Sequence, residues 1–484
     1  MASVEMENQL PSAIPLPIPR DQLKDIVEKA KDWALMHGAA MRPKNNYNPD
    51  TLSFAPFILT PSAFPRKEFE RAVQIQTTLN ELMHKVAHNR QFLTHCLKDT
   101  VQADEFTGNL FKIYETVHDE GITQRVSLGL LRSDYMVHCN AGNKIKQVEI
   151  NTIASSFGGI SILIRKFNRY VLQELGYRDK LVNLPENGAL QGLCGGMLEA
   201  YKIYGKEEAV IMFVVEDVTY NICDQRFHEF EIRRMNPDVR VVRKTLTQIA
   251  HEGKLGSENE LLVDRDEVAV IYFRAGYEPA HYHSKKEWDA RLLMERSQAI
   301  KCPSIQYHLA GTKKVQQELA KGGTVEMFLT EASKIESVKE VFTGLYSLDF
   351  DEFGDQGVQM ALDSPERFVL KPQREGGGNN VYGQNVREAV YKMKDSKERT
   401  AWILMERINP PVSKSYMIRP GGPEVPELVD LVSELGIFGL IIGDSSKIFA
   451  NTQVGHMLRT KISTADEGGV AAGLGALDSP YLID

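Results

Sequence analysis

Three short, continuously apolar segments between residues 205 and 310 constrain the fold of this chain most strongly. Residues 209–215, 239–242 and 268–273 have the length and composition of buried strands. Residues 223–235 and 288–300 follow the first and third of these segments and have the character of helices. This alternation of strands and helices predicts a small parallel α/β unit. Ligands of such units bind beyond the carboxyl ends of the strands.

The C-terminal third predicts a different kind of sheet. Strand candidates at 368–371, 402–408, 437–442 and 447–450 are short and are separated by turns. The sequence from Gly443 to Ser446 is typical of a hairpin connection. We therefore expect an antiparallel sheet in this region.

The N-terminal region predicts helices preceded by an extended tail. Residues 23–34 and 67–86 carry apolar side chains at helical spacing, and Gly38 is a suitable end for the first helix. The tail up to about residue 20 is rich in proline, which favours an extended chain that is either loose or laid on a surface. At roughly 150 residues per domain, 484 residues suggest about three domains or one large elaborated domain.

Charge and composition exclude several classes of function. The formal net charge of −8, from 57 basic and 65 acidic residues, argues against a nucleic-acid-coating protein, but a local basic pocket for a small anion stays possible. No apolar run approaches the roughly 18 residues of a membrane helix, so we expect no membrane partner. Five scattered cysteines without a CxxC pair predict reduced thiols and a cytoplasmic protein. The first nineteen residues contain no Lys or Arg, so no targeting peptide is visible, and a plastid form with a presequence stays an alternative.

The strongest local motif is a lysine followed by a glycine-rich loop. Glycines let backbone N–H groups approach phosphate oxygens, Lys371 and Arg374 supply positive charge, and Glu375 supplies a hard oxygen ligand for Mg²⁺. A flexible surface turn with solvated charges explains the same residues. The lysine precedes the glycines, unlike a Walker A loop, and the HRD and DFG triplets of protein kinases are missing. The motif reads Lys371-Pro372-Gln373-Arg374-Glu375-Gly376-Gly377-Gly378-Asn379-Asn380.

A second motif places two oxygen ligands on one face of a strand. Alternation along the strand candidate at 147–151 puts Glu149 and Asn151 on the same face, which suits half of a Mg²⁺ site. A turn of small residues that includes Ser155 and Ser156 follows and can bring the backbone near a ligand. A solvated strand face is the alternative explanation.

A third motif places two cations on one strand face near the C-terminus. Arg459 and Lys461 can clamp a carboxylate and a phosphate, and a run of small residues follows at 468–473. An exposed charge pair on an edge strand explains them as well. Arg132 suits a carboxylate or a structural ion pair, and Lys313 suits a phosphate or the start of a solvated helix.

Together these motifs supply carboxylates for a metal and cations for anions, without an obvious pair of nucleophile and base. This combination suits phosphoryl transfer, in which positioning and charge neutralisation contribute most of the catalysis.

Several segments resemble the signature segments of the eukaryotic glutathione synthetases. They extend from about residue 130 to residue 473 in family order, which makes the resemblance more specific than any single motif. It implies an α/β ATP-grasp ligase fold with an inserted small parallel α/β substrate-binding domain and a lid. The segments are RSDYM, QVEINTIASSFGG, YFRAGY, LAGTKKVQQEL, KPQREGGGNNVYG, SELGIFG and GHMLRTK with GGVAAG.

The resemblance also implies an activity and a domain plan. The enzyme would be a homodimer that joins glycine to γ-glutamylcysteine with ATP and Mg²⁺, through an acyl phosphate. We expect a tail at 1–20, a catalytic body at 21–205 and 310–484 with a lid at about 340–420, and a substrate-binding domain at 206–309. The loops at 376–378 and 470–473 are expected to close over the site.

The family's functional residues transfer to matching positions of this sequence. The metal ligands would be Glu149, Asn151 and Glu375, and the catalytic residues would be Arg132, Lys371 and Arg459. ATP would be surrounded by Lys313, Lys371, Pro372, Gln373, Arg374, Glu375, Gly376, Gly377, Gly378, Asn379, Asn380, Tyr382, Met405, Glu406, Arg407, Ile408, Glu434, Lys461 and Glu467. The peptide or product would be held by Arg132, Ser155, Ser156, Thr219, Tyr220, Asn221, Gln225, Arg274, Ala275, Gly276, Tyr277, Arg459, Val470 and Ala471.

Two departures and three alternatives accompany this expectation. Ala154 stands where animal relatives have serine, and Glu467 stands where they have aspartate. Some plant relatives use β-alanine in place of glycine, but the pair Ala471-Ala472 matches the glycine-using form. The alternatives are a homoglutathione synthetase, another ATP-grasp carboxylate–amine ligase, and a nucleotide-binding relative without turnover. The retained metal ligands speak against the last.

Overall fold

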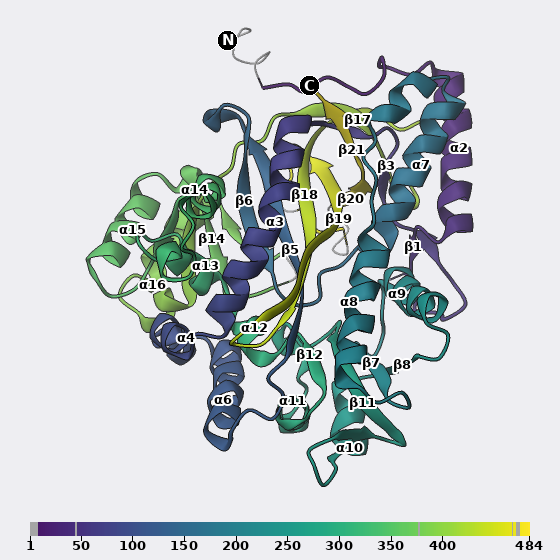
Figure 1. Cartoon of the computed structure of the whole chain (residues 1–484). Coiled ribbons are helices and arrows are strands. Elements are labelled where there is room, and N and C mark those ends of the chain that lie inside the picture. Colours follow the sequence, from purple (N-terminus) through teal and green to yellow (C-terminus); the bar gives the residue numbers. More distant parts are fainter. Residues whose placement is uncertain (1–7, 44–45, 376–377, 467, 471–474) are drawn as a thin grey trace.

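The computed structural model describes residues 8–43, 46–375, 378–466, 468–470 and 475–484, whose elements form three main sheets (Figure 1). The largest has seven strands in the order β17-β3-β20-β19-β18-β5-β6, and only β20 and β3 run parallel among these neighbours. The predicted hairpin after Gly443 is confirmed. The four strand candidates predicted for one antiparallel sheet are divided between two sheets: 437–442 and 447–450 lie in this one, whereas 368–371 and 402–408 lie in the four-stranded sheet. The strands are β3 (Phe57–Ile58), β5 (Ser127–His138), β6 (Lys144–Asn151), β17 (Ser413–Ile418), β18 (Leu428–Gly443), β19 (Ile448–Ile462) and β20 (Gly475–Asp478).

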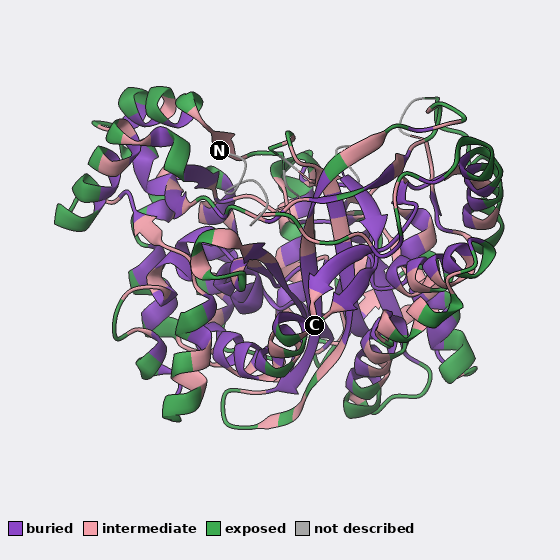
Figure 2. Ribbon diagram, turned by 90° about the horizontal axis from the view of Figure 1, so that it is seen from above, coloured by how far each residue is buried: buried purple, intermediate pink, exposed green. Residues whose placement is uncertain are grey.

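Both faces of this sheet are buried, which explains the nearly continuous apolar run along β18. Leu435 and Ile437 pack into one hydrophobic cluster, whereas Phe438 and Leu440 pack into another on the opposite face. In Figure 2 the buried residues run through the interior and the exposed ones lie along the outer helices. The two clusters are completed by α3 (Arg66–Ala87) on one side and by α2 (Arg20–His37), α7 (Ile160–Glu174) and α8 (Ala189–Tyr204) on the other.

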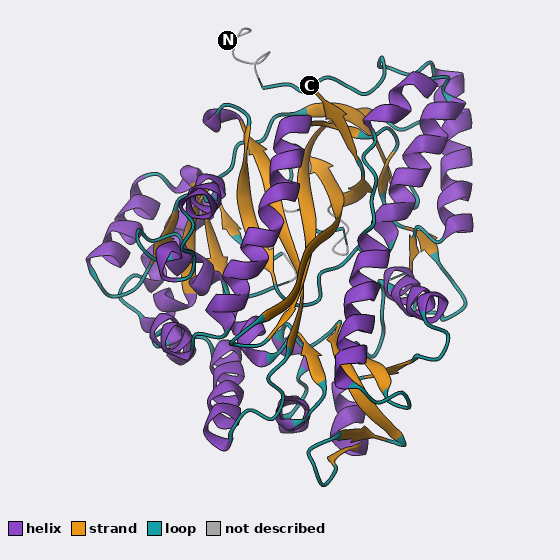
Figure 3. Cartoon of the chain, in the orientation of Figure 1, coloured by secondary structure: helices purple, strands orange, loops and turns teal. Residues whose placement is uncertain are grey.

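The predicted parallel α/β unit is present as a six-stranded sheet. Strands β8, β7, β11 and β12 run parallel, and β10 and β9 extend the sheet antiparallel. Helices cover this sheet at the lower right of Figure 3. The strands are β7 (Val210–Val214), β8 (Arg240–Lys244), β9 (Gly253–Leu255), β10 (Leu261–Val263), β11 (Asp266–Phe273) and β12 (Ile300–Cys302), and the helices are α9 (Ile222–Met235), α10 (Leu246–Glu252) and α11 (Lys285–Arg296).

The helix predicted at 288–300 extends too far. The structure ends α11 at Arg296 and places Ile300 in β12, where it pairs with Val270 of β11. Ile300 is fully buried in the sheet. A short apolar run does not distinguish a buried strand from the end of a helix, and the pairing with β11 decides between them here.

A third, four-stranded antiparallel sheet has a hydrophobic core of its own. Its order is β13-β16-β14-β15, and Leu348, Phe368, Leu370 and Leu404 form part of the core. This separate core lies apart from the two clusters that flank the large sheet. The elements are β13 (Leu345–Ser347), β14 (Phe368–Pro372), β15 (Val381–Tyr382), β16 (Trp402–Glu406), α15 (Glu352–Asp363) and α16 (Gln384–Met393).

The remaining elements connect these layers. In the described part of the tail, Gln9 pairs with Val412, and Ile14 and Ile18 are buried, so this part is laid on the surface of the body. Strand β21 pairs in parallel with β4 near the start of the chain. The elements are α4 (Arg90–Leu97), α5 (Thr100–Ala103), α6 (Glu105–Glu120), α12 (Ile305–Ala310), α13 (Lys313–Leu319), α14 (Ala332–Val341), β1 (Ala40–Met41), β2 (Ser53–Phe54), β4 (Ser62–Pro65), β21 (Pro480–Ile483) and the 3₁₀ turns η1 (Cys139–Ala141), η2 (Arg178–Asn183), η3 (Pro279–His281), η4 (Val325–Met327), η5 (Pro365–Arg367) and η6 (Lys397–Ala401).

Helix α8 packs closely on β18 and β19 because it presents glycine to the sheet. A Cβ atom at Gly192 would lie 2.4 Å from the Cβ of Val454, a stiff β-branched side chain. At Gly195, on the same helix, the nearest atom to such a Cβ is the terminal methyl of Met235 at 3.8 Å. The two glycines therefore differ in packing while sharing the same helical backbone.

We predict opposite effects on stability for alanine at these two positions. Gly192→Ala should lower the free energy of unfolding by about 1–3 kcal/mol through overpacking. Gly195→Ala should raise it by up to about 1 kcal/mol, the difference in helix propensity between the two residues. Denaturant unfolding of the two variants beside the unmodified chain measures both effects. Equal shifts in the two variants would contradict the close approach of α8.

Candidate functional site

A cavity of about 430 Å³ lies where the three sheets meet. Its walls come from β5, β6, β18 and β19 of the large sheet, from β14 to β16 of the four-stranded sheet, and from the loop after β11. The cavity brings together many of the residues that the sequence predicts for the site: Arg132, Glu149, Asn151, Ser155, Ser156, Tyr277, Lys371, Glu375, Asn380, Tyr382, Met405, Glu406, Arg407, Ile408, Glu434, Arg459, Lys461 and Val470.

Four of the predicted site residues lie outside the described residues. They are Gly376 and Gly377 of the glycine-rich loop, and Glu467 and Ala471 near the C-terminus. The two loops expected to close over the site, 376–378 and 470–473, fall largely in these stretches.

One buried ammonium group lies between two of the predicted metal ligands. Lys313 begins α13, and its Nζ is 3.2 Å from Oε2 of Glu149 and 3.1 Å from Oε1 of Glu375. Lys371, on β14, donates from Nζ to the Val148 carbonyl at 3.0 Å and lies 3.9 Å from Glu149. Two lysines and two glutamates from three segments therefore converge at one part of the cavity, which we call its floor, and all of them except Lys313 line the cavity.

Neighbouring charges separate the pKa values of the two glutamates, although both carboxyls are largely buried. Burial raises the pKa of Glu375 to about 7, and the negative charge of Glu149 adds to this shift against the opposing charge of Lys313. Burial acts in the same direction on Glu149, but the charges of Lys313, Lys371 and Arg459 hold the pKa of that carboxyl well below its usual range. Burial also lowers the pKa of Lys371. The cluster thus combines a carboxylate that stays ionised with one that titrates near neutral pH.

The donor set at this point fits a magnesium ion. Glu149 and Glu375 each direct a carboxylate oxygen toward Nζ of Lys313. The charge of this one lysine is not enough to bring the pKa of Glu375 down to its usual value. Asn151, on the same strand face as Glu149, uses its amide nitrogen to bind Asp134 at 2.9 Å, so its oxygen is the atom left for a ligand. Carboxylate and amide oxygens are hard ligands of the kind that Mg²⁺ prefers.

Two arginines in the cavity wall are oriented by buried acids. Arg132 donates from Nε and Nη2 to both carboxylate oxygens of Asp134, at 2.6 and 2.8 Å, and from Nη1 to the Ser156 carbonyl at 3.1 Å. Arg459 forms an ion pair with Glu434 and lies 3.7 Å from Asp134. The sequence analysis missed Asp134, although alternation with Arg132 along one strand was a signal that could have found it.

The loop after β6 is held by a carboxylate from a distant helix. Asp224, on α9, accepts hydrogen bonds from the backbone N–H groups of Phe157 at 2.8 Å, Gly159 at 2.8 Å and Ile160 at 3.0 Å. Ala154 and Phe157 adopt positive φ angles of 51° and 75°, which non-glycine residues rarely do and which recur at functional sites. Asp224 was missed as well, because no sequence pattern links it to a loop about 65 residues earlier.

The same loop binds Arg274, which directly follows β11 at the carboxyl end of that strand. Its Nη1 donates to the Ser155 carbonyl at 3.1 Å, and its Nη2 donates to the Ser156 hydroxyl at 2.7 Å. The hydroxyl of Ser155 is buried and has no hydrogen-bond partner among the described residues. It lies in the cavity wall and is a donor available to a ligand.

Other predicted residues are described but do not line the cavity. The side chain of Gln373 binds the backbone of Lys314, and Arg374 forms an ion pair with Asp104 at 2.6 Å. Thr219 and Gln225 both accept hydrogen bonds from Arg243. This group also contains Pro372, Gly378, Asn379, Tyr220, Asn221, Ala275 and Gly276. Lys313 and Arg274 do not line the cavity either, but both contact residues that do.

The cavity also has an apolar wall. Val369 of β14 and Met405 of β16 are cross-strand partners, and Ile408 follows β16. An apolar surface beside a cluster of cations and carboxylates suits a ligand with a flat ring at one end and phosphates at the other.

Among the described helices, none combines the length and the hydropathy that a membrane span requires.

The chain matches one family model, described as "Eukaryotic glutathione synthase, ATP binding domain", over residues 20–482. It is 43% identical to glutathione synthetase of Xenopus laevis over 465 residues, which cover 95% of this chain and 97% of the relative. It is 41% identical to a chloroplastic glutathione synthetase of Solanum lycopersicum over 497 residues, which cover 99% of this chain and 89% of the relative.

A solved structure shares the fold. The apo form of a glutathione synthetase-like effector from Globodera pallida has a TM-score of 0.77 and 24% sequence identity, and covers 96% of this chain and 98% of its own. Together with the family match, this likeness confirms the predicted α/β ATP-grasp fold.

We predict that removing the cation of this charge cluster lowers stability strongly, and that a second substitution restores part of the loss. Lys313→Met leaves two buried carboxylates close together, which should lower the free energy of unfolding at pH 8 by about 3–5 kcal/mol. Adding Glu375→Gln removes one negative charge and should restore part of that loss. Denaturant unfolding of the single and double variants tests the pair, and a single variant as stable as the unmodified chain would contradict the cluster.

Proposed function

The chain belongs to the eukaryotic glutathione synthase family, and from this premise we propose that its cavity joins glycine to γ-glutamylcysteine with cleavage of ATP. The product is glutathione, and the by-products are ADP and phosphate. The observation that supports this most directly is the convergence of Lys313, Lys371, Glu149 and Glu375 at the floor of the cavity, which suits the terminal phosphates of ATP.

In the first step, a carboxylate oxygen of the cysteinyl residue attacks the γ-phosphorus of ATP. The bond from that phosphorus to the bridging oxygen breaks, and ADP leaves with the electron pair. Lys313 and Lys371 would neutralise charge that develops on the phosphoryl oxygens. Glu149, Asn151 and Glu375 would hold Mg²⁺, which when bound supplies further neutralisation of the phosphates.

In the second step, the neutral amine of glycine attacks the carbonyl carbon of the acyl phosphate. The bond from that carbon to the phosphate oxygen breaks, phosphate leaves, and the amine loses a proton to water. Arg132 and Arg459, both oriented by Asp134 and its neighbours, would hold the carboxylates of the peptide. Because water hydrolyses an acyl phosphate, the site has to exclude it during this step.

The remaining roles follow the geometry of the cavity. The nucleotide ring would lie against the apolar wall of Val369, Met405 and Ile408, and the peptide would lie toward Ser155, Ser156, Arg274 and Tyr277. The peptide side would be completed by Gln225 of α9 and by Thr219, Tyr220 and Asn221 directly before that helix. We assign the lid to the four-stranded sheet, at about 340–420, because it has a separate core. The α/β unit at about 206–309 is the proposed substrate-binding domain.

Assembly and location are proposals of the same kind. We propose a homodimer, following the resemblance in the sequence. We also propose a cytoplasmic location, and a plastid is the alternative because two plant relatives are named as chloroplastic.

The cluster predicts which variants abolish turnover. Lys371→Ala and Glu375→Ala should each lower kcat by about a hundredfold or more, because each removes a charge that acts on the phosphates. The readout is phosphate release, which in the unmodified chain should require the dipeptide, glycine and Mg²⁺ together. Lys392→Ala and Glu366→Ala, at exposed positions of the same region, are matched controls and should keep normal rates. Normal turnover in a folded Lys371→Ala or Glu375→Ala variant would refute the assignment.

The acceptor should be glycine in preference to β-alanine. The relatives reported above are named glutathione synthetases, and Ala471-Ala472 matches the glycine-using form. One methylene group is worth about 1–3 kcal/mol, so we expect kcat/KM to favour glycine by roughly 10–200-fold, with slow use of β-alanine. Phosphate release with each acceptor measures this ratio, and equal rates would identify a different specificity.

A further inference from the structure

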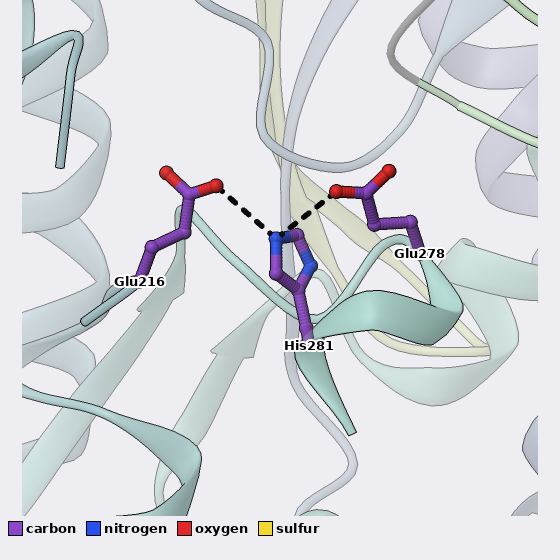
Figure 4. A group of neighbouring side chains, drawn as sticks. All are labelled: Glu216, Glu278 and His281. Carbon is purple, nitrogen blue, oxygen red and sulfur yellow. Dashed lines mark hydrogen bonds and ion pairs between the residues drawn. The ribbon is translucent and has the colours of Figure 1, made fainter. Parts of the chain in front are cut away.

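A histidine flanked by two glutamates lies beside the peptide side of the cavity (Figure 4). Nε2 of His281 is 3.2 Å from Oε1 of Glu216 and 3.4 Å from Oε1 of Glu278. The histidine side chain is only 8% exposed, whereas the two glutamates are about one-third exposed, at 32% and 38%. Glu216 follows β7, and His281 ends η3 in the segment that follows β11.

The distances alone would suit a metal ion, because the three ligand atoms lie within 4.8 Å of one another. The other ring nitrogen argues against it. Nδ1 of His281 accepts a hydrogen bond from the backbone N–H of Gly276 at 3.0 Å, so Nδ1 carries no proton. The neutral ring therefore carries its proton on Nε2, which donates toward the glutamates and has no lone pair for a metal. Metal-binding histidines show the opposite arrangement, in which the second nitrogen donates.

The contact with Gly276 connects this histidine to the cavity. Gly276 has a φ of +93°, and its carbonyl accepts a hydrogen bond from the Tyr282 hydroxyl at 3.0 Å. A side chain at this position would both strain the backbone and approach that hydroxyl to 3.2 Å. The backbone N–H and the carbonyl of Gly276 thus both have hydrogen-bond partners, which restricts the conformation of the turn between Arg274 and Tyr277.

Tyr277 connects this restricted turn to the cavity wall. Its ring meets the ring of His281 edge to face, with centroids 4.7 Å apart and planes at 81°. Burial raises the pKa of Tyr277, and the charges of Glu216 and Glu278 add to that shift. Tyr277 lines the cavity and belongs to the proposed peptide side.

We propose that His281 is a positioning residue for the dipeptide substrate. As the neutral ring protonated on Nε2, it is anchored by Glu216 and Glu278 and holds the Gly276 N–H, and so it fixes Arg274 and Tyr277 toward the cavity. This inference rests on the proposed function, because it assigns those two residues to the peptide. It assigns no metal to the cluster.

Kinetics of three variants at this position test which contact matters. His281→Ala should raise KM for γ-glutamylcysteine roughly tenfold, the effect of a hydrogen bond worth about 1.4 kcal/mol. The kcat and the KM for ATP should stay within about twofold, because the loop binds substrate and transition state alike. His281→Asn keeps an acceptor near the position of Nδ1 and should restore most of the affinity, whereas His281→Gln places its amide near the position of Nε2, away from the Gly276 N–H, and should not.

His283 offers a matched control in the same segment. It is 59% exposed and contacts Asp217 at 3.5 Å. His283→Ala should therefore leave KM for the dipeptide unchanged. If His281→Asn is no better than His281→Ala in folded protein, or if His283→Ala has the same effect, the positioning role is wrong.

A spectroscopic test is independent of turnover. In the full chain labelled with ¹⁵N-histidine, the His281 signals, assigned by their loss in His281→Asn, should show a protonated Nε2 and an unprotonated Nδ1. One equivalent of Zn²⁺ without nucleotide should leave these signals unchanged. A proton on Nδ1, or Zn²⁺ binding that is lost in His281→Asn and kept in His283→Ala, would overturn the proposal in favour of a metal site. Absence of glycine-dependent phosphate release in the unmodified chain would instead refute the proposed function and leave the tautomer result valid.

Discussion

A buried ammonium group shared by two carboxylates connects the layers of this protein at its cavity. Lys313 begins α13, Glu149 lies on β6, and Glu375 follows β14, so segments far apart in the sequence converge on one charge. Desolvation disfavours that cation, and its place at a helix N-terminus adds to the penalty. The two carboxylates offset the penalty only when the four-stranded sheet packs against the body. Formation of the site and docking of that sheet are therefore coupled.

The sequence predicts the parts of this site that depend on strand periodicity. Glu149 and Asn151, like Arg459 and Lys461, line the same cavity because residues two apart share a strand face in any topology. The apolar strand predicted before the glycine-rich loop, at 368–371, is also present, as β14. These predictions need only the local conformation of a few residues, and such conformation is encoded locally.

The parts that sequence reasoning missed depend on pairing across the chain. Asp224 binds backbone N–H groups about 65 residues earlier, which only the tertiary fold brings to it. Asp134 and His281 also have a contact within their own segment, but their contacts with Arg459 and Glu216 form only in the tertiary fold. The error at Ile300 has the same origin, because the register with β11 decides its conformation. Periodicity shows which side chains share a face, whereas it does not show which distant backbone group needs a partner.

The two sides of the cavity differ in how their loops are held. On the proposed peptide side, Asp224, Arg243 and His281 do not line the cavity themselves but form hydrogen bonds with buried polar groups of its loops. Because an unpaired polar group is costly in a low dielectric, these loops have few alternative conformations. On the proposed nucleotide side, the four-stranded sheet has its own core, and its contacts with the body include ion pairs such as Arg374 with Asp104. Because its core is separate from the two clusters of the body, this sheet suits the proposed lid at about 340–420, beside loops that are held in place by buried hydrogen bonds.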